Sequence, residues 1–448
     1  MPKPAVRGPG QGFPAGIQVL WSGMDTGPAR ALCRFIDDSP SPMHAATSLA
    51  RGLAAAGFTD LPLERPEWGL APGRYQVRRG ASIAAFILRS RDLDRFQLVG
   101  AHTDSPHLRL KPHPSFSAEG CRQLGVEVYG SALWNSWLDR DLGLAGTVHG
   151  ADGTQILVSI DRPLARVSQL AIHLDRKVNE EGLKLNPQLH LAPIWGLSRD
   201  GVDSHHEFLA LLEKASGIPA TEIVAHDLSL YDLTNSRLGG ADEELIFAPR
   251  LDNLASCHAG LVALTAAGEG DQRALPLLVC LDHEEVGSTS DRGAAGSFLE
   301  VVLERISLEL GTSRAGYLSM LSRSQMLSAD MAHAAHPNYP ERSEPRHKPL
   351  LGRGPVLKCN HNQRYATSGT SAAHVHQLAR HAGITLQDFV ARSDIGCGST
   401  IGPLAAARLG VSVADVGNPM LSMHSARECA ATSDHPAYIA LLHAHFLG

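Results

Sequence analysis

"RFQLVGAHTDS" (residues 95–105) decides how the chain is organised, because a short apolar run there stops abruptly at polar residues. Residues 96–101 have the composition of a buried strand. The same shape returns in "ALPLLVCLDHEEVGS" (274–288), "SQMLSADMAHA" (324–334) and "GVSVADVGNPMLSMHS" (410–425). In each of these stretches an apolar run is followed by Asp, Glu or His. The pattern predicts buried strands that end in chemically reactive side chains.

Alanine-rich helical stretches alternate with these strands. Examples are "NLASCHAGLVALTAAG" (253–268) and "GPLAAARLG" (402–410), and residues 29–57 predict two more helices separated by a Ser-Pro-Ser-Pro break. Apolar strands alternating with helices are typical of a sheet covered on both faces. The expected fold class is therefore α/β, with a mixed, mainly parallel sheet between helices. In such sheets ligands bind at the carboxyl ends of the strands.

The sequence changes character between residues 105 and 247. Shorter alternating pieces such as "GVEVYG" and "EIVAHDLSLYDL" predict a mostly-β insertion, with one clear helix at 204–217. We therefore expect residues 29–104 and 248–448 to form one discontinuous domain. The inserted domain would occupy residues 105–247.

The composition and charge of the chain restrict the kinds of function that it could have. The chain has 448 residues, a net charge of −6 and no basic block, which makes nucleic acid a poor partner. Its seven cysteines are scattered without a CxxC spacing, which favours a reducing compartment. No apolar run approaches the ~20 residues of a membrane span. Residues 1–28 lack a signal pattern and are predicted to be a flexible leader, with Met24 as an alternative start, so we expect a cytoplasmic protein without membrane contact.

Several Asp and His residues stand at predicted strand ends or helix starts, and each has two interpretations. His102 and Asp104 are two apart at a strand end, where their side chains share a side, so Asp104 could hold a metal-binding His102. The alternative is a strand-end turn. Asp252 opens a helix, either as a ligand or as an ordinary N-cap. Asp330 and His424 are likewise either ligands or turn residues.

Glu284 and Glu285 stand side by side directly after an apolar run. Two adjacent carboxylates repel each other unless a cation or a shared proton compensates, and no basic residue follows within the next five positions. If the segment ends a strand, the two side chains point to opposite faces and have different tasks. A hydrated surface turn is the alternative.

Together these residues offer the oxygen and nitrogen ligands that suit zinc, manganese or cobalt, without a thiolate. The candidate ligands are His102, Asp252, Glu285, Asp330 and His424. One bridging carboxylate and two ligands per ion would give a two-metal site with ions ~3.5–4 Å apart, as aminopeptidases use to activate water. Glu284 would then be the general base.

An ordered set of longer motifs resembles the aspartyl aminopeptidase family of dinuclear zinc exopeptidases. The motifs are "GAHTDSPHLRLKP", "RLDNLAS", "DHEEVGSTSDRGAAGSFLE", "SADMAHAAHPNYPERSEPRHKPLLGRGPVLKCNHNQRYAT", "SDIGCGSTIGP" and "GNPMLSMHSARE". The resemblance runs from about residue 30 to the C-terminus. It implies terminal zinc ligands at His102, Glu285, Asp330 and His424, a bridging Asp252, a general base at Glu284 and an orienting role for Asp104 on His102.

The resemblance also implies substrate contacts and an assembly. Lys358 matches a lysine of the side-chain pocket, where a cation would select an N-terminal Asp or Glu; a solvated loop lysine is the alternative. His173 matches a histidine that reaches a neighbouring subunit's site and stabilises the oxyanion, although it could simply end an exposed strand. The inserted domain would dimerise, and the dimers would build a closed dodecamer.

The function that these expectations describe is a two-zinc aminopeptidase that releases acidic residues from peptides with a free N-terminus. A second enzymatic possibility keeps the metals but prefers neutral residues or acts as a deacylase. A third is a non-catalytic metal-binding assembly protein on the same fold. The presence of Glu284 favours catalysis, because binding a metal needs Glu285 but no neighbouring base.

Overall fold

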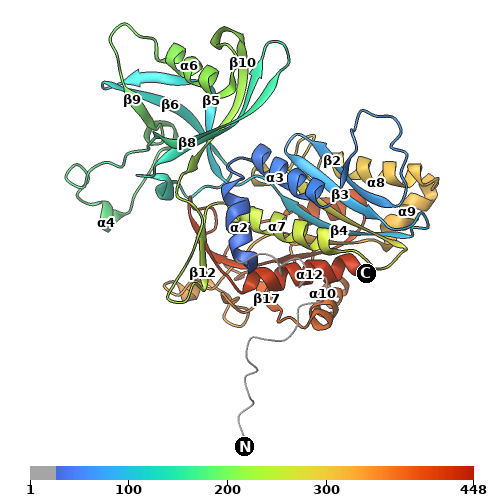
Figure 1. The fold of residues 1–448 in the computed structure, drawn as a ribbon. Coiled ribbons are helices and arrows are strands. Elements are labelled where there is room, and N and C mark those ends of the chain that lie inside the picture. The colour runs from blue at the N-terminus through green and yellow to red at the C-terminus, as the bar shows by residue number, and fades with distance from the viewer. Residues whose placement is uncertain (1–26) are drawn as a thin grey trace, which may run out of the picture.

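The large central sheet contains all four strands that the sequence pattern singled out (Figure 1). The structure is a computed structural model and describes residues 27–448. Within that range the sheet has nine strands, in the order β1-β2-β3-β13-β4-β14-β18-β16-β17. Their bounds are β1 (Thr59–Asp60), β2 (Gly73–Arg79), β3 (Ser82–Leu88), β4 (Arg95–His102), β13 (Ala274–Leu281), β14 (Gln325–Ala329), β16 (Val356–Cys359), β17 (Gln387–Val390) and β18 (Ser412–Gly417).

The middle of this sheet is parallel. β13, β4, β14 and β18 are parallel neighbours, whereas β3 and β16 join this group in the antiparallel sense. The register places His102 opposite Leu281, so β4 and β13 end at the same level. Because parallel strands point the same way, the residues that follow them gather at one edge of the sheet.

Helices cover both faces of the central sheet. One face carries α2 (Gly27–Asp37), α3 (Pro42–Ala55), α7 (Leu251–Ala266), α10 (Gly369–Ala382) and α12 (Asp434–Leu447). The other carries α8 (Phe298–Glu309), α9 (Arg314–Arg323) and α11 (Ile401–Leu409). On β4, Val99 and Ala101 pack against the first group while Phe96 and Leu98 pack against the second. Both sides of the strand are thus buried, which explains its continuous apolar run.

A second sheet stands apart from the first, at the upper left of Figure 1. It is antiparallel and has the order β8-β7-β10-β5-β6-β9. Its strands are β5 (His107–Ala118), β6 (Cys121–Tyr129), β7 (Leu142–Gly150), β8 (Gln155–Ala165), β9 (Ile194–Leu197) and β10 (Ile223–Asp232). The helix α6 (Ser204–Ser216) packs on it through Phe208 and Leu212, and α4 (Val178–Glu181) and α5 (Pro187–His190) are single turns.

A third, small sheet connects two of the predicted site segments. It has the order β11-β12-β20-β19-β15, with bounds β11 (Arg237–Gly239), β12 (Leu245–Ala248), β15 (Ala332–His333), β19 (Pro419–Leu421) and β20 (Glu428–Ala431). β15 runs parallel to β19. The chain after Asp330 is therefore held beside the chain that leads to His424.

The predicted fold class, α/β with a mostly-β insertion, is confirmed by this architecture. The exact division into domains stays a prediction. The predicted leader needs a correction at its end, because Gly27 and Pro28 begin α2, where a proline is tolerated in the first turn. Met24 and the rest of the leader lie outside the described residues. None of the helices between Gly27 and Gly448 is long and apolar enough to cross a membrane.

We expect Gly417→Ala to disturb the strand edge beside Asp330. A Cβ atom at position 417 would lie 1.7 Å from the carbonyl oxygen of Asp330, so the backbone there must move. Overpacking of this kind typically costs about 1–3 kcal/mol of unfolding free energy, measurable as a lower urea midpoint. Gly268→Ala is the control, since nothing lies within 4 Å of its Cβ position. Equal midpoints for the two variants would contradict the expectation.

Candidate metal centre

The predicted site residues come together in a hollow of about 530 Å³ at the carboxyl edge of the central sheet. His102 is the last residue of β4, and Asp330 directly follows β14. Glu284 and Glu285 lie in the 3-10 turn Glu284–Val286, a short distance after β13 ends at Leu281. The glutamate pair is thus on a turn rather than on the strand end that we considered. The side chains of these four residues line the hollow.

Asp252 lies in the first turn of α7, but its φ of −82° and ψ of 106° are not helical. The N-cap position of α7 is occupied by Arg250, so Asp252 is not the N-cap that the alternative interpretation required. Its backbone N–H donates to Glu428 Oε2 (3.1 Å), and its carbonyl oxygen accepts from Ser105 Oγ (2.7 Å). Oδ1 lies 3.4 Å from His102 Nε2, while Oδ2 lies 3.3 Å from His424 Nε2. One carboxylate therefore faces both imidazoles.

His424 reaches the hollow from the turn between β19 and β20. Its Nδ1 lies 3.1 Å from the carbonyl oxygen of Ser131, which can only accept, so Nδ1 carries the proton. The other nitrogen, Nε2, is left to face Asp252 and lies 3.4 Å from Glu285 Oε1. The backbone N–H of His424 donates to Glu428 Oε1 (2.7 Å). A metal that displaces the second proton of the ring would therefore bind at Nε2.

Asp104 supports His102 and the glutamate turn together. The carbonyl oxygen of Asp104 lies 3.0 Å from His102 Nδ1, closer than its own carboxylate at 3.4 Å. The carboxylate instead accepts the backbone N–H groups of Glu284 (3.2 Å) and Glu285 (3.1 Å). It also accepts the hydroxyl of Tyr129 (2.8 Å). Sequence reasoning connected Asp104 with His102 only.

The buried charges perturb one another strongly. Burial, followed by the neighbouring carboxylates, raises the pKa of Glu284 to about 8, and burial and Asp252 raise the pKa of Glu285 well above its ordinary value. Burial alone would lower the pKa of His424, but Asp252 and Glu285 outweigh it and raise the value to about 10. For Asp252 burial acts upward, and the imidazoles His102 and His424 bring its pKa down.

These side chains fit a bound zinc ion. Asp252 Oδ1 and Glu285 Oε1 are buried and accept no hydrogen bond. His102, Asp252 and Glu285 each offer one ligand atom, and these atoms lie within 4.8 Å of one another. A cluster of buried carboxylates is costly unless cations compensate it, and carboxylate with imidazole is a donor set that zinc accepts.

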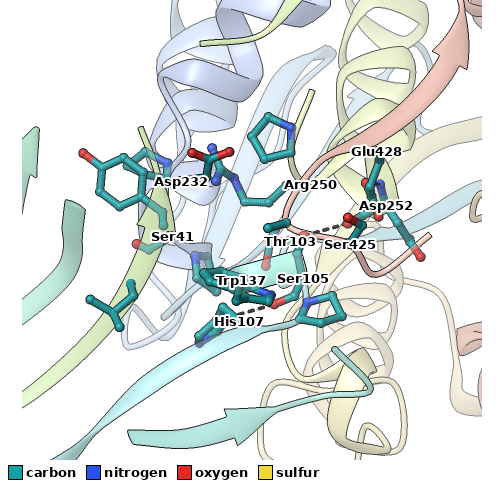
Figure 2. Close-up of a pocket in the computed structure, with 17 residues that line it drawn as sticks. Ser41, Thr103, Ser105, His107, Trp137, Asp232, Arg250, Asp252, Ser425 and Glu428 are labelled. Atoms are coloured by element: carbon teal, nitrogen blue, oxygen red, sulfur yellow. Dashed lines mark hydrogen bonds between the residues drawn. The ribbon is translucent and has the colours of Figure 1, made fainter. Parts of the chain in front are cut away.

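Glu428, the first residue of β20, is a residue that sequence reasoning missed. Its two carboxylate oxygens accept the backbone N–H groups of Asp252 and His424, so it holds two predicted ligands at once. Figure 2 shows Glu428 beside Asp252 and Ser425 at one side of a second, small cavity, with Arg250 and Asp232 farther along. The only available signal was its position in "MHSARE", four residues after His424.

Lys358 and His173 have very different positions. Lys358 is 1% exposed on β16, and its Nζ donates to the carbonyl oxygen of Met331 (3.1 Å). The same Nζ lies 3.9 Å from Asp330 Oδ2 and 5.1 Å from the centre of the Tyr365 ring, so a buried cation borders the metal hollow. His173 is exposed in a turn between β8 and α4 and does not line the hollow.

Comparison with known proteins identifies the family. Residues 35–446 match the family model described as aminopeptidase I zinc metalloprotease (M18). The chain belongs to the M18 aminopeptidase family. It is therefore a zinc metalloaminopeptidase, a hydrolase, as the sequence motifs predicted.

The relatives of this M18 chain are similar over nearly their whole length. A probable M18 family aminopeptidase 2 of Streptomyces avermitilis is 47% identical over 414 residues, which cover 92% of this chain and 95% of that protein. Its counterpart in Mycobacterium leprae is 46% identical over 428 residues, covering 93% and 98%.

Solved structures of similar proteins agree with the fold. A cryo-EM structure of the Ape4 and Nbr1 complex contains a chain with a TM-score of 0.89 and 39% identity, covering 94% of this chain and 85% of that one. The S. cerevisiae mApe1 dodecamer has a TM-score of 0.80 and 27% identity, covering 93% and 96%.

We expect the metal-free protein to lose stability as pH rises from about 7 to about 8. Glu284 and Glu428 each have a folded pKa of about 8 against an ordinary value of 4.5, so in this window they hold protons in the folded chain that the unfolded chain has released. The free energy of unfolding then falls with pH. His424, with its pKa raised from 6.5 to about 10, acts in the same direction. Below about pH 7 buried histidines act in the opposite direction, because burial lowers the pKa of His44 and His107 to about 4.

Zinc should oppose this loss, because bound ligands are deprotonated and metal affinity grows with pH. The measurement is Tm against pH for chelator-treated and zinc-loaded protein. The gap in Tm between the two forms should widen toward alkaline pH. A chelator-treated protein whose Tm is level or rising across the window would contradict the expectation.

Proposed function

We propose that this M18 chain is a two-zinc aminopeptidase that releases N-terminal Asp or Glu from peptides. The observation that carries the proposal is the Asp252 carboxylate, whose two oxygens face different imidazoles, His102 and His424. A carboxylate with a different imidazole beside each of its oxygens is suited to bridge two metal ions. Cobalt or manganese would accept the same donors.

The remaining ligands divide between the two imidazoles. Asp330 Oδ1 lies 3.8 Å from His102 Nε2, and Glu285 Oε1 lies 3.4 Å from His424 Nε2. We assign His102 and Asp330 to one zinc and Glu285 and His424 to the other. Zinc bound there would supply Lewis acidity, which polarises the scissile carbonyl and lowers the pKa of water.

Glu284 is the general base of the proposed reaction. It lines the hollow, and its Oε2 lies 4.0 Å from His102 Nε2, while its backbone is held by Asp104. It takes a proton from the attacking water and gives that proton to the leaving amine. Asp104 contributes by orienting His102 through its carbonyl oxygen.

Lys358 is the proposed selector of acidic side chains. A buried ammonium group at the wall of the hollow would attract the carboxylate of an N-terminal Asp or Glu. The distance of 3.9 Å from its Nζ to Asp330 Oδ2 favours a competing function, since part of its charge is already compensated. In that case the enzyme would prefer neutral residues, or act as a deacylase, on the same metals.

The proposed active form is a dodecamer built from dimers, in the cytoplasm. Residues 105–247 would be the dimerisation domain, and residues 29–104 with 248–448 the catalytic domain. The segment around His173 exposes several large apolar side chains, which supports burial against another subunit. They are Leu170, Ile172, Leu174 and Leu189. His173 from a neighbouring subunit would stabilise the oxyanion.

We expect Glu284→Gln to abolish catalysis while leaving zinc in place. Removal of a general base lowers kcat by about 10²–10⁴-fold. Zinc content, measured by atomic absorption, should stay at the wild-type level because Glu284 is not a proposed ligand. Glu285→Gln is the matched comparison, since it should lose zinc as well as activity. Full activity in Glu284→Gln would exclude Glu284 as the general base. A wild type that holds zinc but hydrolyses no peptide would instead favour the non-catalytic alternative.

We expect the wild type to release Asp and Glu from a panel of X-Ala peptides, and a chelator to stop the release. Lys358→Met should lower kcat/KM for Asp peptides relative to Leu peptides, because the cation that attracts the carboxylate is gone. Lys348→Met, a change at an exposed lysine, is the control and should leave the ratio unaltered. An unchanged Asp-to-Leu ratio in Lys358→Met would exclude Lys358 as the selector, and a wild type that prefers Leu peptides would support the neutral-preference alternative.

A further inference from the structure

The chain that leaves β6 of the second sheet runs directly against the metal centre. We call residues 129–133 the Tyr129 segment. It begins at Tyr129, the last residue of β6 in the inserted sheet, and is far in sequence from most of the proposed ligands. Its contacts with the centre are made at three places.

The first contact holds His424. The carbonyl oxygen of Ser131 accepts from Nδ1 of His424 (3.1 Å), and the backbone N–H of Leu133 donates to the carbonyl oxygen of His424 (2.9 Å). The ring and the backbone of this ligand are thus both attached to the Tyr129 segment. A hydrogen bond at Nδ1 selects the tautomer whose Nε2 is free to bind a metal.

The second contact holds Asp104. The Tyr129 hydroxyl donates to Asp104 Oδ2 at 2.8 Å, and the acceptor is fully buried. The same carboxylate accepts the backbone N–H groups of Glu284 and Glu285. Tyr129 therefore acts on the proposed base and on one proposed ligand through a single shared carboxylate.

The third contact is a close approach at Glu285. Gly130 has a φ of +69°, and a Cβ atom there would lie 3.0 Å from Cβ of Glu285. The tyrosine ring itself is kept in place by stacking on His107, with ring centres 4.5 Å apart and planes 12° apart. The Tyr129 segment therefore forms one side of the centre and is packed closely against it.

We propose that Tyr129 is a positioning residue for the metal centre, and that through it the inserted sheet fixes the glutamate turn that carries Glu284 and Glu285. The proposal rests on the proposed function, because it takes these two residues as base and ligand. Asp104 can accept several hydrogen bonds, and loss of the one from Tyr129 frees the carboxylate to rotate. The turn then loses its fixed distance from His102.

The test compares Tyr129→Phe with wild type and with Tyr231→Phe, all as the full chain. Tyr129→Phe keeps the ring that stacks on His107 and removes only the hydroxyl. Tyr231 is the matched control, since it is a buried tyrosine of the same sheet whose hydroxyl lies near Asp161 and Ser159 instead of near the centre. The readouts are zinc transfer to a chromophoric chelator, the visible spectrum of the cobalt-substituted protein, and kcat and KM separately.

We expect Tyr129→Phe to give up zinc more readily or lose kcat by about 10–100-fold, the range seen when a hydrogen-bond partner of a ligand is removed. KM should change by less than about twofold, and the cobalt spectrum should shift. Tyr231→Phe should behave as wild type. Wild-type zinc retention, spectrum and kcat in Tyr129→Phe would overturn the inference, and so would an equal loss in Tyr231→Phe.

The outcome for the wild type separates the two proposals. A wild type without chelator-sensitive peptide release would end the proposed function and this inference with it. A wild type that holds zinc and is active, together with a Tyr129→Phe variant that is indistinguishable from it, would end the inference alone.

Discussion

The carboxylate of Asp252 is the constraint on which the centre depends, because it is buried between two imidazoles and next to further carboxylates. Its oxygens lie 3.4 Å from His102 Nε2 and 3.3 Å from His424 Nε2, and Glu285 stands close by with an oxygen that accepts no hydrogen bond. Carboxylates collected in a buried place repel one another and raise each other's pKa. The arrangement is stable only with compensating positive charge, which protons or metal ions can supply.

The parallel order of the central strands makes this collection possible. β4, β13 and β14 end at one edge of the sheet, so residues that are far apart in sequence follow their strands into the same hollow. The third sheet then holds the segments after Asp330 and before His424 side by side. The backbone thus brings together carboxylates that would otherwise repel, and apolar packing on both faces of the strands opposes that repulsion.

Hydrogen bonds connect the inserted sheet to the metal centre. Tyr129 and Ser131 belong to the chain that leaves this sheet, yet they hold Asp104 and His424. The part of the molecule that the sequence pattern predicts to be a separate domain therefore contributes to the geometry of the proposed ligands. Any force that moves the inserted sheet against the central sheet would be transmitted to the centre through these hydrogen bonds.

The sequence by itself determined the fold class and the chemical nature of the centre, because both depend on local patterns. An apolar run followed by His, Asp or Glu identifies a buried strand and a polar strand end without knowledge of the rest of the chain, as at His102 and Asp330. The longer motifs then predicted the family. Each of these patterns spans only a few neighbouring residues, so it can be recognised without knowledge of the tertiary structure.

Only the tertiary structure decided which groups hold the proposed ligands. The hydrogen bond between His424 and Ser131 joins residues 293 positions apart, and the support of Asp252 and His424 by Glu428 depends on where β20 lies. The glutamate pair proved to lie on a 3-10 turn after its strand, and His102 proved to be held by the carbonyl oxygen of Asp104. Such contacts are set by the packing of distant segments, which leaves no periodic pattern in the sequence.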